Sequence, residues 1–147
     1  MFTMTPVGTV RSPYLDKTQI PKGPWAEHRA EGVLELLPHL EPALSDIEGF
    51  SHLYVLWVFD RSDTGYELQG VPPNAARPHG LFATRSPRRP NPIGLTVVTL
   101  LRREGFRLFV RGVDMLDGTP ILDIKPYLSS VAPEELRRGW LDLEAHF

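Results

Sequence analysis

Prolines and glycines recur along the whole chain and divide it into short segments. The 147 residues include 15 prolines and 12 glycines. Proline interrupts the hydrogen bonding of helices and sheets, and glycine favours turns, so the uninterrupted segments stay short. This spacing favours strands joined by loops over long helices. By its length, the chain is expected to form one domain, residues 1–147, with a buried core.

One predicted strand, residues 51–59, is apolar on both of its faces. After His52 it runs through leucine, tyrosine, valine, tryptophan and phenylalanine with no polar alternation. Such a strand must be covered on both sides. Because the chain contains little predicted helix, we expect the interior of a β-barrel on one side and a partner subunit on the other. The sequence therefore predicts a homodimer.

The remaining pattern predicts a mainly β, antiparallel, barrel-like domain with a short C-terminal helix. Further strands are expected at residues 4–10, 31–37, 95–101, 106–113 and 121–126. A turn is expected at Asp117-Gly118, a dipeptide typical of hairpins. The helix is expected over residues 133–143, where Leu136, Trp140 and Leu143 recur at helical spacing. This apolar face should pack on the barrel.

Residues 80–95 form the most unusual stretch of the sequence. Residues 81–83 are expected to be a strand that enters the core. The residues that follow, 84–92, are called the Arg/Pro loop below. Its three prolines and three arginines are Pro87, Pro90 and Pro92, and Arg85, Arg88 and Arg89. The prolines make the loop stiff and extended. Guanidinium groups on a stiff loop are suited to binding phosphate or carboxylate through paired hydrogen bonds.

Two simpler interpretations of the Arg/Pro loop stand beside this one. Pro87 and Pro90 fit the Pro-x-x-Pro pattern of an extended ligand for the aromatic groove of a partner. The loop is equally compatible with a plain surface linker. Ligands of the Pro-x-x-Pro type usually lie in polar, disordered segments. Here both flanks are apolar and strand-like, which favours a loop that belongs to a site.

Composition excludes several classes of function. The net charge of −2 argues against a nucleic-acid binder that acts through a general positive field, so contacts to nucleic acid would need local arginine clusters. Without cysteine there are no disulfides, thiolate metal sites or cysteine nucleophiles, and a cytoplasmic location is expected. No apolar run is long enough to cross a membrane. The five histidines lack the spacing of a metal site, so no metal is expected. Serine-hydrolase and Rossmann fingerprints are absent.

Several polar residues stand at the ends of predicted strands. They are Asp60, Arg61, Arg85, Asp117, Thr119, Asp123 and Lys125. Each alone is explained by a turn or by an edge strand. Together with the Arg/Pro loop, they indicate one shared pocket. Trp25 lies in a Pro/Gly-rich loop, where its ring either covers the core or is offered to a ligand.

Four groups of residues resemble the TsaA-like or TrmO family of S-adenosylmethionine-dependent tRNA methyltransferases. They are residues 7–14, residues 49–53, residues 82–86 with 89–94, and residues 117–120 with 123–127. The resemblance implies a non-Rossmann β-barrel methyltransferase that acts as a homodimer, with the cofactor near the subunit interface. Members methylate the exocyclic nitrogen of threonylcarbamoyl-adenosine beside the anticodon. This chain is expected to be a short form without the C-terminal domain that many bacterial relatives carry.

The resemblance also implies roles for individual residues. Cofactor contacts would come from Pro24, Trp25, Ala26, Asp60, Arg61, Arg85, Leu95, Asp117, Gly118, Thr119 and Pro120. Asp60 and Arg61 stand where relatives often place His-Gln. Within this set, Trp25 would lie against the adenine or the sulfonium, and Arg85 would pair with the carboxylate of the cofactor. Asp117 would receive a ribose hydroxyl or the amino group.

Substrate contacts and a base are assigned in the same way. Arg88, Arg89, Asn91 and Lys125 are the candidate tRNA contacts, with the two arginines on phosphates. The candidates for the base that removes a proton from the nitrogen are His52, Asp60 and Asp123. Two alternatives remain: a methyltransferase with a substrate other than tRNA, and a non-enzymatic β-barrel module that docks a partner through the Arg/Pro loop.

Overall fold

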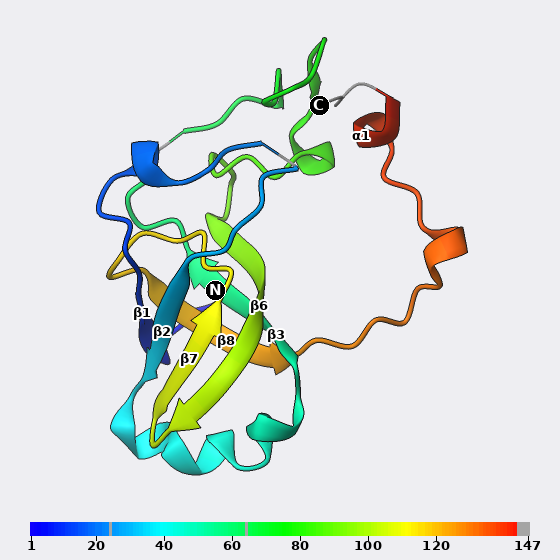
Figure 1. Cartoon of the computed structure of the whole chain (residues 1–147). Coiled ribbons are helices and arrows are strands. Elements are labelled where there is room, and N and C mark those ends of the chain that lie inside the picture. Colours follow the sequence, from blue (N-terminus) through cyan, green and yellow to red (C-terminus); the bar gives the residue numbers. More distant parts are fainter. Residues whose placement is uncertain (24, 64, 144–147) are drawn as a thin grey trace.

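Six antiparallel strands close into a barrel in the computed structural model, which describes residues 1–23, 25–63 and 65–143 (Figure 1). The strands are β1 (Gly8–Arg11), β2 (Glu31–Leu36), β3 (His52–Val58), β6 (Ile93–Glu104), β7 (Arg107–Arg111) and β8 (Pro120–Pro126). Around the barrel their order is β1-β2-β7-β6-β3-β8. The predicted mainly β, antiparallel barrel is confirmed.

Strand β3 supplies one wall of the core. Its inward side chains are buried and its outward ones half-buried, namely Leu53, Val55 and Trp57 inside and Tyr54, Leu56 and Val58 outside. This alternation is the period of two that a strand imposes on its side chains. The barrel interior expected on one face of β3 is therefore confirmed. The homodimer expected on the other face stays a prediction.

Strand β6 is 12 residues long, the longest in the barrel. Its register with β7 shifts between Leu100 and Arg102, which marks a β-bulge. A second irregularity separates Leu56 from Trp57 in the pairing of β3 with β8. Bulges bend a strand and increase its twist, which helps a sheet of few strands to close on itself.

Short elements connect the strands. They are the 3₁₀ turns η1 (Lys17–Gln19), η2 (Pro38–Leu44), η3 (Ile47–Gly49), η4 (Leu81–Ala83) and η5 (Pro133–Glu135), the two-residue strands β4 (Gln69–Gly70) and β5 (His79–Gly80), and the helix α1 (Trp140–Leu143). The first barrel strand starts later than predicted, at Gly8. Before it, the Val7 N–H donates to Ile121 O at 2.8 Å, but residues 4–6 are not strand.

The strand predicted at residues 81–83 is wrong, because this segment forms the 3₁₀ turn η4. Leu81 is buried, whereas Phe82 is 82% exposed. The Thr84 hydroxyl donates to Leu81 O at 2.8 Å and closes the turn. A local bond from a side chain to the backbone competes with strand pairing in this way.

The helix predicted over residues 133–143 is mostly wrong. Only its last four residues form an α-helix, so the short C-terminal helix of the predicted fold is confirmed as α1. Gly139 has a φ of 55°, in the left-handed region, which interrupts a right-handed helix. Leu136 is 58% and Leu143 74% exposed, so no helical face packs on the barrel. Without such packing a short helix is marginal in water.

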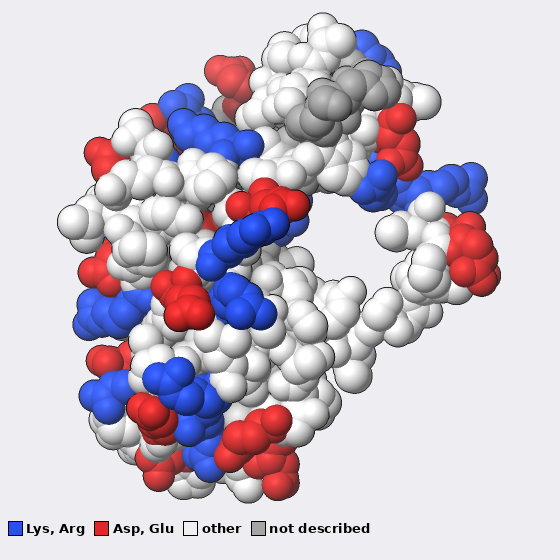
Figure 2. All heavy atoms as spheres, in the orientation of Figure 1, with Lys and Arg blue, Asp and Glu red and all other residues white. Residues whose placement is uncertain are grey.

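The segment of residues 127–139, called the C-terminal arm below, runs away from the barrel instead (Figure 1). An opening separates the arm from the barrel (Figure 2). Beyond the arm, Trp140 Nε1 donates to Ala83 O at 2.8 Å, and its ring stacks on His79 with 4.4 Å between centroids. The chain thus returns to the segment that precedes the Arg/Pro loop. No helix in the described part of the chain is both long and apolar enough to cross a membrane.

Candidate functional site

The end of β3 and the start of β8 bring four predicted polar residues together. Asp60, Arg61, Asp117 and Thr119 are called the strand-end cluster below. Arg61 Nη2 donates to Thr119 Oγ1 at 3.2 Å, and Arg61 Nε donates to Asp60 Oδ1 at 3.3 Å. Thr119 is 2% exposed and precedes Pro120, the first residue of β8. The structure thus brings these four residues together, while the single pocket predicted for them with Arg85, Asp123 and Lys125 stays a prediction.

The Asp117-Gly118 turn fixes the second carboxylate of this cluster. Asp117 Oδ1 accepts a hydrogen bond from the Ser12 N–H at 3.0 Å, while the Asp117 N–H donates to Tyr14 O at 2.7 Å. Gly118 has a φ of 86°, a conformation that favours glycine, and its N–H donates to Val10 O at 2.8 Å. The turn is thereby tied to β1 and to the segment after it.

Arg85 and Leu95, both predicted cofactor contacts, lie together at the start of β6. Arg85 Nη2 donates to Leu95 O. Leu95 is 44% exposed and lies on the outer face of the barrel. Near the end of the Arg/Pro loop, Asn91 O accepts a hydrogen bond from the Ile93 N–H at 2.8 Å. The loop is thus connected directly to β6.

The other two loop arginines have different surroundings. Arg88 is exposed, and its Nη2 lies 2.6 Å from Asp63 Oδ2. Arg89 is half-buried, and its Nη1 donates to Thr84 O at 2.8 Å and to Ser86 O at 3.2 Å. Arg89 therefore stabilises the backbone of the loop, whereas Arg88 remains at the surface.

A cleft of about 380 Å³ lies between the segment after β3 and the Arg/Pro loop. Its lining consists of Val58, Phe59, Asp60, Ser62, Asp63, Gly65, Tyr66, Pro87, Arg89, Pro90 and Pro92. It thus combines Asp60, a predicted cofactor contact, with Arg89, a predicted substrate contact. Its volume falls within the range of small-molecule sites.

A second cleft of about 310 Å³ lies on the outer face of β2, β6 and β7. It is lined by Glu31, Gly32, Val33, Leu101, Arg102, Phe109 and Val110. None of these is a predicted site residue. The Arg102 guanidinium already covers the Phe109 ring, 3.9 Å from its centroid. The first cleft is therefore the better candidate.

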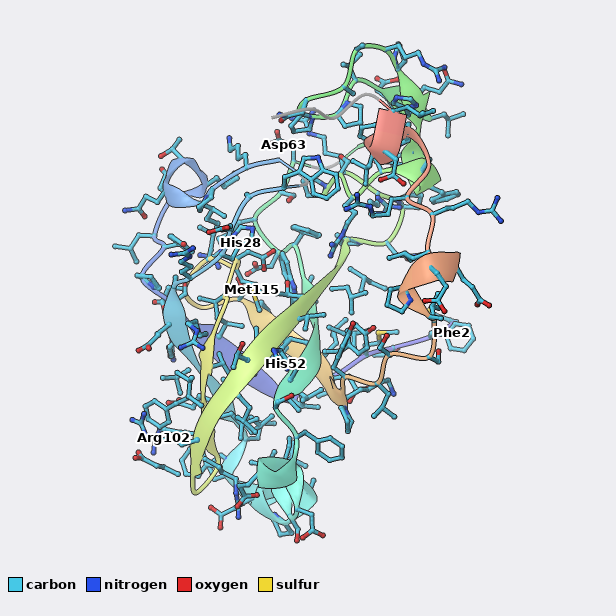
Figure 3. The ribbon with its side chains drawn as sticks, turned by 45° about the vertical axis from the view of Figure 1, so that its right-hand side comes forward. Phe2, His28, His52, Asp63, Arg102 and Met115 are labelled. Atoms are coloured by element: carbon cyan, nitrogen blue, oxygen red, sulfur yellow. The ribbon has the colours of Figure 1, made fainter. Side chains whose placement is uncertain are left out.

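Of the three candidate bases, only Asp60 lines the first cleft. His52 lies at the other end of β3, six residues and thus roughly 20 Å from Val58. Figure 3 shows this separation between His52 and Asp63, a residue of the cleft. The His52 Nδ1 lies 2.7 Å from the Ser51 hydroxyl. The Asp123 carboxylate pairs with Lys125 at 3.1 Å on β8.

The loop between β1 and β2, called the early loop below, contacts the C-terminal arm through Trp25. The Arg138 guanidinium lies over the Trp25 ring, 4.1 Å from its centroid. The Ala26 N–H donates to Gly23 O at 3.3 Å and forms a tight turn. Pro24, also a predicted cofactor contact, lies outside the described residues. The face of the Trp25 ring is thus able to receive a cation.

A capped 3₁₀ turn, η1, organises the beginning of this loop. Asp16 Oδ1 accepts hydrogen bonds from the Thr18 N–H at 2.8 Å and the Thr18 hydroxyl at 2.9 Å. In return, the Gln19 side chain accepts the Asp16 N–H at 3.0 Å, which completes a capping box. The bond from the Thr18 backbone holds the pKa of the Asp16 carboxyl below its ordinary value.

Comparison with known proteins supplies the family. The family model described as "tRNA-methyltransferase O N-terminal domain" matches residues 9–132. The chain belongs to the tRNA-methyltransferase O family. A crystal structure of TrmO from Pseudomonas aeruginosa superimposes with a TM-score of 0.75 at 38% identity, over 95% of this chain and 62% of that one. The predicted family and the barrel fold are thus confirmed together.

Two curated relatives of this TrmO-family chain carry functional names. A "probable S-adenosyl-L-methionine-binding protein" of Archaeoglobus fulgidus is 46% identical over 92% of this chain. A mouse "tRNA (adenine(37)-N6)-methyltransferase" is 38% identical over 89% of this chain. The chain spans 37% of the length of the archaeal relative and 32% of that of the mouse relative.

The TrmO-family barrel also holds polar residues that the sequence did not single out. Trp57 Nε1 donates to Thr96 Oγ1 at 3.0 Å, and the Thr96 hydroxyl donates to Asp114 Oδ1 at 2.6 Å. The available signal was Thr96 itself, a polar residue at an inward position of an otherwise apolar strand. Among the described residues, no group of three or more His, Asp or Glu side chains is placed to hold a metal ion.

Proposed function

We propose that this chain is an S-adenosylmethionine-dependent methyltransferase that acts in the cytoplasm on N6 of threonylcarbamoyl-adenosine, next to the tRNA anticodon. The names of its relatives support the cofactor and the tRNA substrate. The observation that carries the proposal is the cleft, where Asp60 after β3 meets the Arg/Pro loop. When bound, the cofactor supplies a methyl group on a positively charged sulfur.

Three further predicted contacts, which are not among the residues that line the cleft, suit the chemistry of this cofactor. Arg85 is exposed and suited to its carboxylate, while Asp117 offers a fixed carboxylate to a ribose hydroxyl or the amino group. The Trp25 ring already accepts one cation, Arg138, on its face. The same face suits a sulfonium. Methyl transfer is an in-line displacement, so these residues contribute mainly by alignment and by exclusion of water.

Asp60 is the base in this proposal. The substrate nitrogen forms a bond to the methyl carbon while the bond from that carbon to sulfur breaks, and the nitrogen then loses a proton. A base must lie within hydrogen-bond reach of that proton. Asp60 lines the cleft, and its Oδ1 is held by Arg61 Nε at 3.3 Å. His52 and Asp123 are not among the cleft residues.

The tRNA contacts rest on local groups, since basic and acidic side chains are interspersed on the surface (Figure 2). Arg88 is the exposed arginine beside the cleft and suits a phosphate, although it must exchange its ion pair with Asp63. Asn91 and Lys125 are both exposed and provide further contacts. Arg89 supports the conformation of the loop.

The active form in this proposal is a homodimer, formed through the outer face of β3 and β6. Three consecutive cross-strand pairs on this face are apolar or aromatic, namely Tyr54 with Val97, Leu56 with Leu95, and Val58 with Ile93, while the last pair, His52 with Thr99, is polar. Ile93, Leu95 and Val97 are 40%, 44% and 41% exposed. A contiguous apolar surface of this kind is typical of subunit interfaces. Because Leu95 O binds Arg85, a partner subunit on this face would lie beside the cofactor contacts.

Nucleoside mass spectrometry of tRNA from a deletion strain tests the proposal. The N6-methylated nucleoside should disappear in the deletion strain and return when the gene is restored. A retained modification would contradict the tRNA substrate. Purified protein should separately gain about 2.7 kcal/mol of stability at a hundred times the Kd of S-adenosylmethionine. If it gains that stability while the tRNA is unchanged, the substrate is another molecule, an alternative that the net charge of −2 permits.

A further inference from the structure

A chain of hydrogen bonds joins three neighbouring segments of the barrel wall, and two of its three side chains are buried, whereas Asp114 is half-buried. It links Trp57 on β3, Thr96 on β6 and Asp114 after β7. Trp57 is 6% and Thr96 7% exposed. Nothing in the predicted or proposed roles so far involves these three side chains. Buried polar side chains in an apolar core are costly unless they are hydrogen-bonded, so their retention requires a reason.

The chemistry of the three groups determines which group donates and which accepts in each of these hydrogen bonds. The indole Nε1–H of Trp57 is a donor only, so the Thr96 oxygen must accept it. The single hydroxyl proton of Thr96 is then free to be donated to the Asp114 carboxylate, 2.6 Å away. Each donor has one acceptor, and the indole ring is held in one orientation.

Trp57 in turn supports the wall of the cleft. Its ring packs against Phe59 with 4.2 Å between centroids and 56° between planes. Phe59 lines the cleft, and its N–H donates to Pro92 O at 2.9 Å, another residue of the cleft. Asp60 follows directly. The orientation of the indole therefore determines where Phe59 and the start of the following segment lie.

The indole also lies directly on the backbone of β6. A Cβ on Gly94 would lie 2.2 Å from Trp57 Cε2, so only glycine leaves room for the ring. The next residue, Leu95, gives its carbonyl oxygen to Arg85. Trp57 thus contacts both a residue of the cleft wall, Phe59, and the strand β6, whose Leu95 carbonyl oxygen accepts a hydrogen bond from Arg85.

We infer that Asp114 and Thr96 are positioning residues, which act through the orientation of Trp57 to set the geometry of the cleft that binds the methyl donor. This inference rests on the proposed function of the cleft. Neither residue needs to touch the cofactor. Their contribution is that the cleft is already in its binding conformation before the ligand arrives, which lowers the cost of binding.

The substitution Thr96→Val tests the inference, because it keeps the shape of the side chain and removes the hydroxyl. We expect the affinity for S-adenosylmethionine to fall about tenfold in calorimetry well below the unfolding temperature, and the Trp57 indole N–H resonance to shift in NMR spectra. Thr96→Ser keeps the hydroxyl and should restore both. Thr99→Val on the same strand is the matched control, since no hydrogen bond of its side chain is seen in the described structure.

Substitutions of Asp114 provide an independent test of the inference. Asp114→Asn keeps an oxygen that accepts the Thr96 hydroxyl and should bind S-adenosylmethionine nearly as well as the natural protein. Asp114→Ala removes the acceptor and should weaken binding several-fold. If Thr96→Val and Asp114→Ala bind as tightly as the natural protein and only unfold at lower temperature, the positioning role is overturned while the proposed function stands. If the natural protein itself binds no S-adenosylmethionine, the proposed function is overturned, and the inference with it.

Discussion

The strand-end cluster and the Arg/Pro loop face the same part of the molecule but are held in place in different ways. In the cluster, the side chains bind partners far away in the sequence: Asp117 binds the Ser12 N–H, and Arg61 binds Thr119. In the loop, Arg89 binds Thr84 and Ser86, only five and three residues away. The cluster is thus part of the barrel, whereas the loop largely supports itself.

This difference distinguishes two properties that a binding site needs, namely fixed geometry and the ability to adjust to a partner. Groups fixed by the barrel have their geometry set when the chain folds, which suits the precise orientation of a small ligand. A self-supporting surface loop can adjust to a large and charged partner at low cost, since little of the core depends on it. In the proposed function, the cluster is therefore assigned to the cofactor, and the exposed part of the loop to the tRNA.

The largest effect, a loss of stability, is expected for a substitution of Gly94, which lies on the strand that supports both regions. With Gly94→Ala, the new Cβ would lie 2.2 Å from Trp57 Cε2, and the ring cannot move without disturbing the core. We expect a loss of about 3 kcal/mol in the free energy of unfolding, measured by urea denaturation. Gly80→Ala is the control, because its Cβ would meet nothing within 4 Å and its φ is −60°. Equal stability of the two variants would contradict this packing.

The next effect concerns Arg85, which belongs to the loop but reaches the barrel at Leu95 O. If Arg85 pairs with the carboxylate of the cofactor, Arg85→Ala should weaken binding of S-adenosylmethionine by about tenfold in calorimetry, a loss of about 1.4 kcal/mol. Since Arg85 is exposed, the stability of the barrel should change little. An unchanged affinity would rule out the role and assign Arg85 to the support of Leu95 alone.

The same contrast explains how much the sequence could predict. The barrel strands can be predicted from apolar runs and from alternating apolar and polar residues, as in β3 and β7. The reason is that every second side chain of a strand points to the same face and is buried together. The Asp117-Gly118 turn was predictable for a local reason as well. The family resemblance then predicted cofactor contacts that no pattern of spacing alone would have assigned, and these contacts stay predictions.

What the sequence could not predict depends on distant contacts. Leu136, Trp140 and Leu143 do have helical spacing. Leu136 and Leu143 do not pack on the barrel, however, and only the four residues of α1 are helical. The hydrogen bond between Thr96 and Asp114 joins residues that are 18 positions apart in the sequence but lie on neighbouring segments of the barrel wall. Such a contact becomes visible only after the strands have been placed in register.

A smaller effect should distinguish the two neighbouring arginines of the loop, the exposed Arg88 and the half-buried Arg89. Arg88→Glu should weaken tRNA binding several-fold and reduce its dependence on salt, because one phosphate contact is lost. Arg89→Ala should instead change the conformation of the loop, since two backbone carbonyls lose their donor. Binding of tRNA to both variants, measured by filter binding at several salt concentrations, checks this. If both variants change the salt dependence equally, Arg89 also contacts phosphate.

The smallest effect is expected in η1, which belongs to neither region. Because the folded pKa of Asp16 is lowered, its bonds to Thr18 contribute stability above the ordinary aspartate pKa of about 3.9, and this contribution is lost as the pH falls through the lower folded value. Asp16→Ala should therefore increase amide exchange at Thr18 at neutral pH, while Asp16→Asn, which keeps an acceptor oxygen, should do so less. The unfolding temperature should fall only slightly in Asp16→Ala, and the affinity for S-adenosylmethionine should stay unchanged in both variants, since Asp16 is exposed and binds only neighbouring residues. A loss of affinity in Asp16→Ala would mean that η1 places Trp25 in the binding site, and the early loop would then belong with the strand-end cluster.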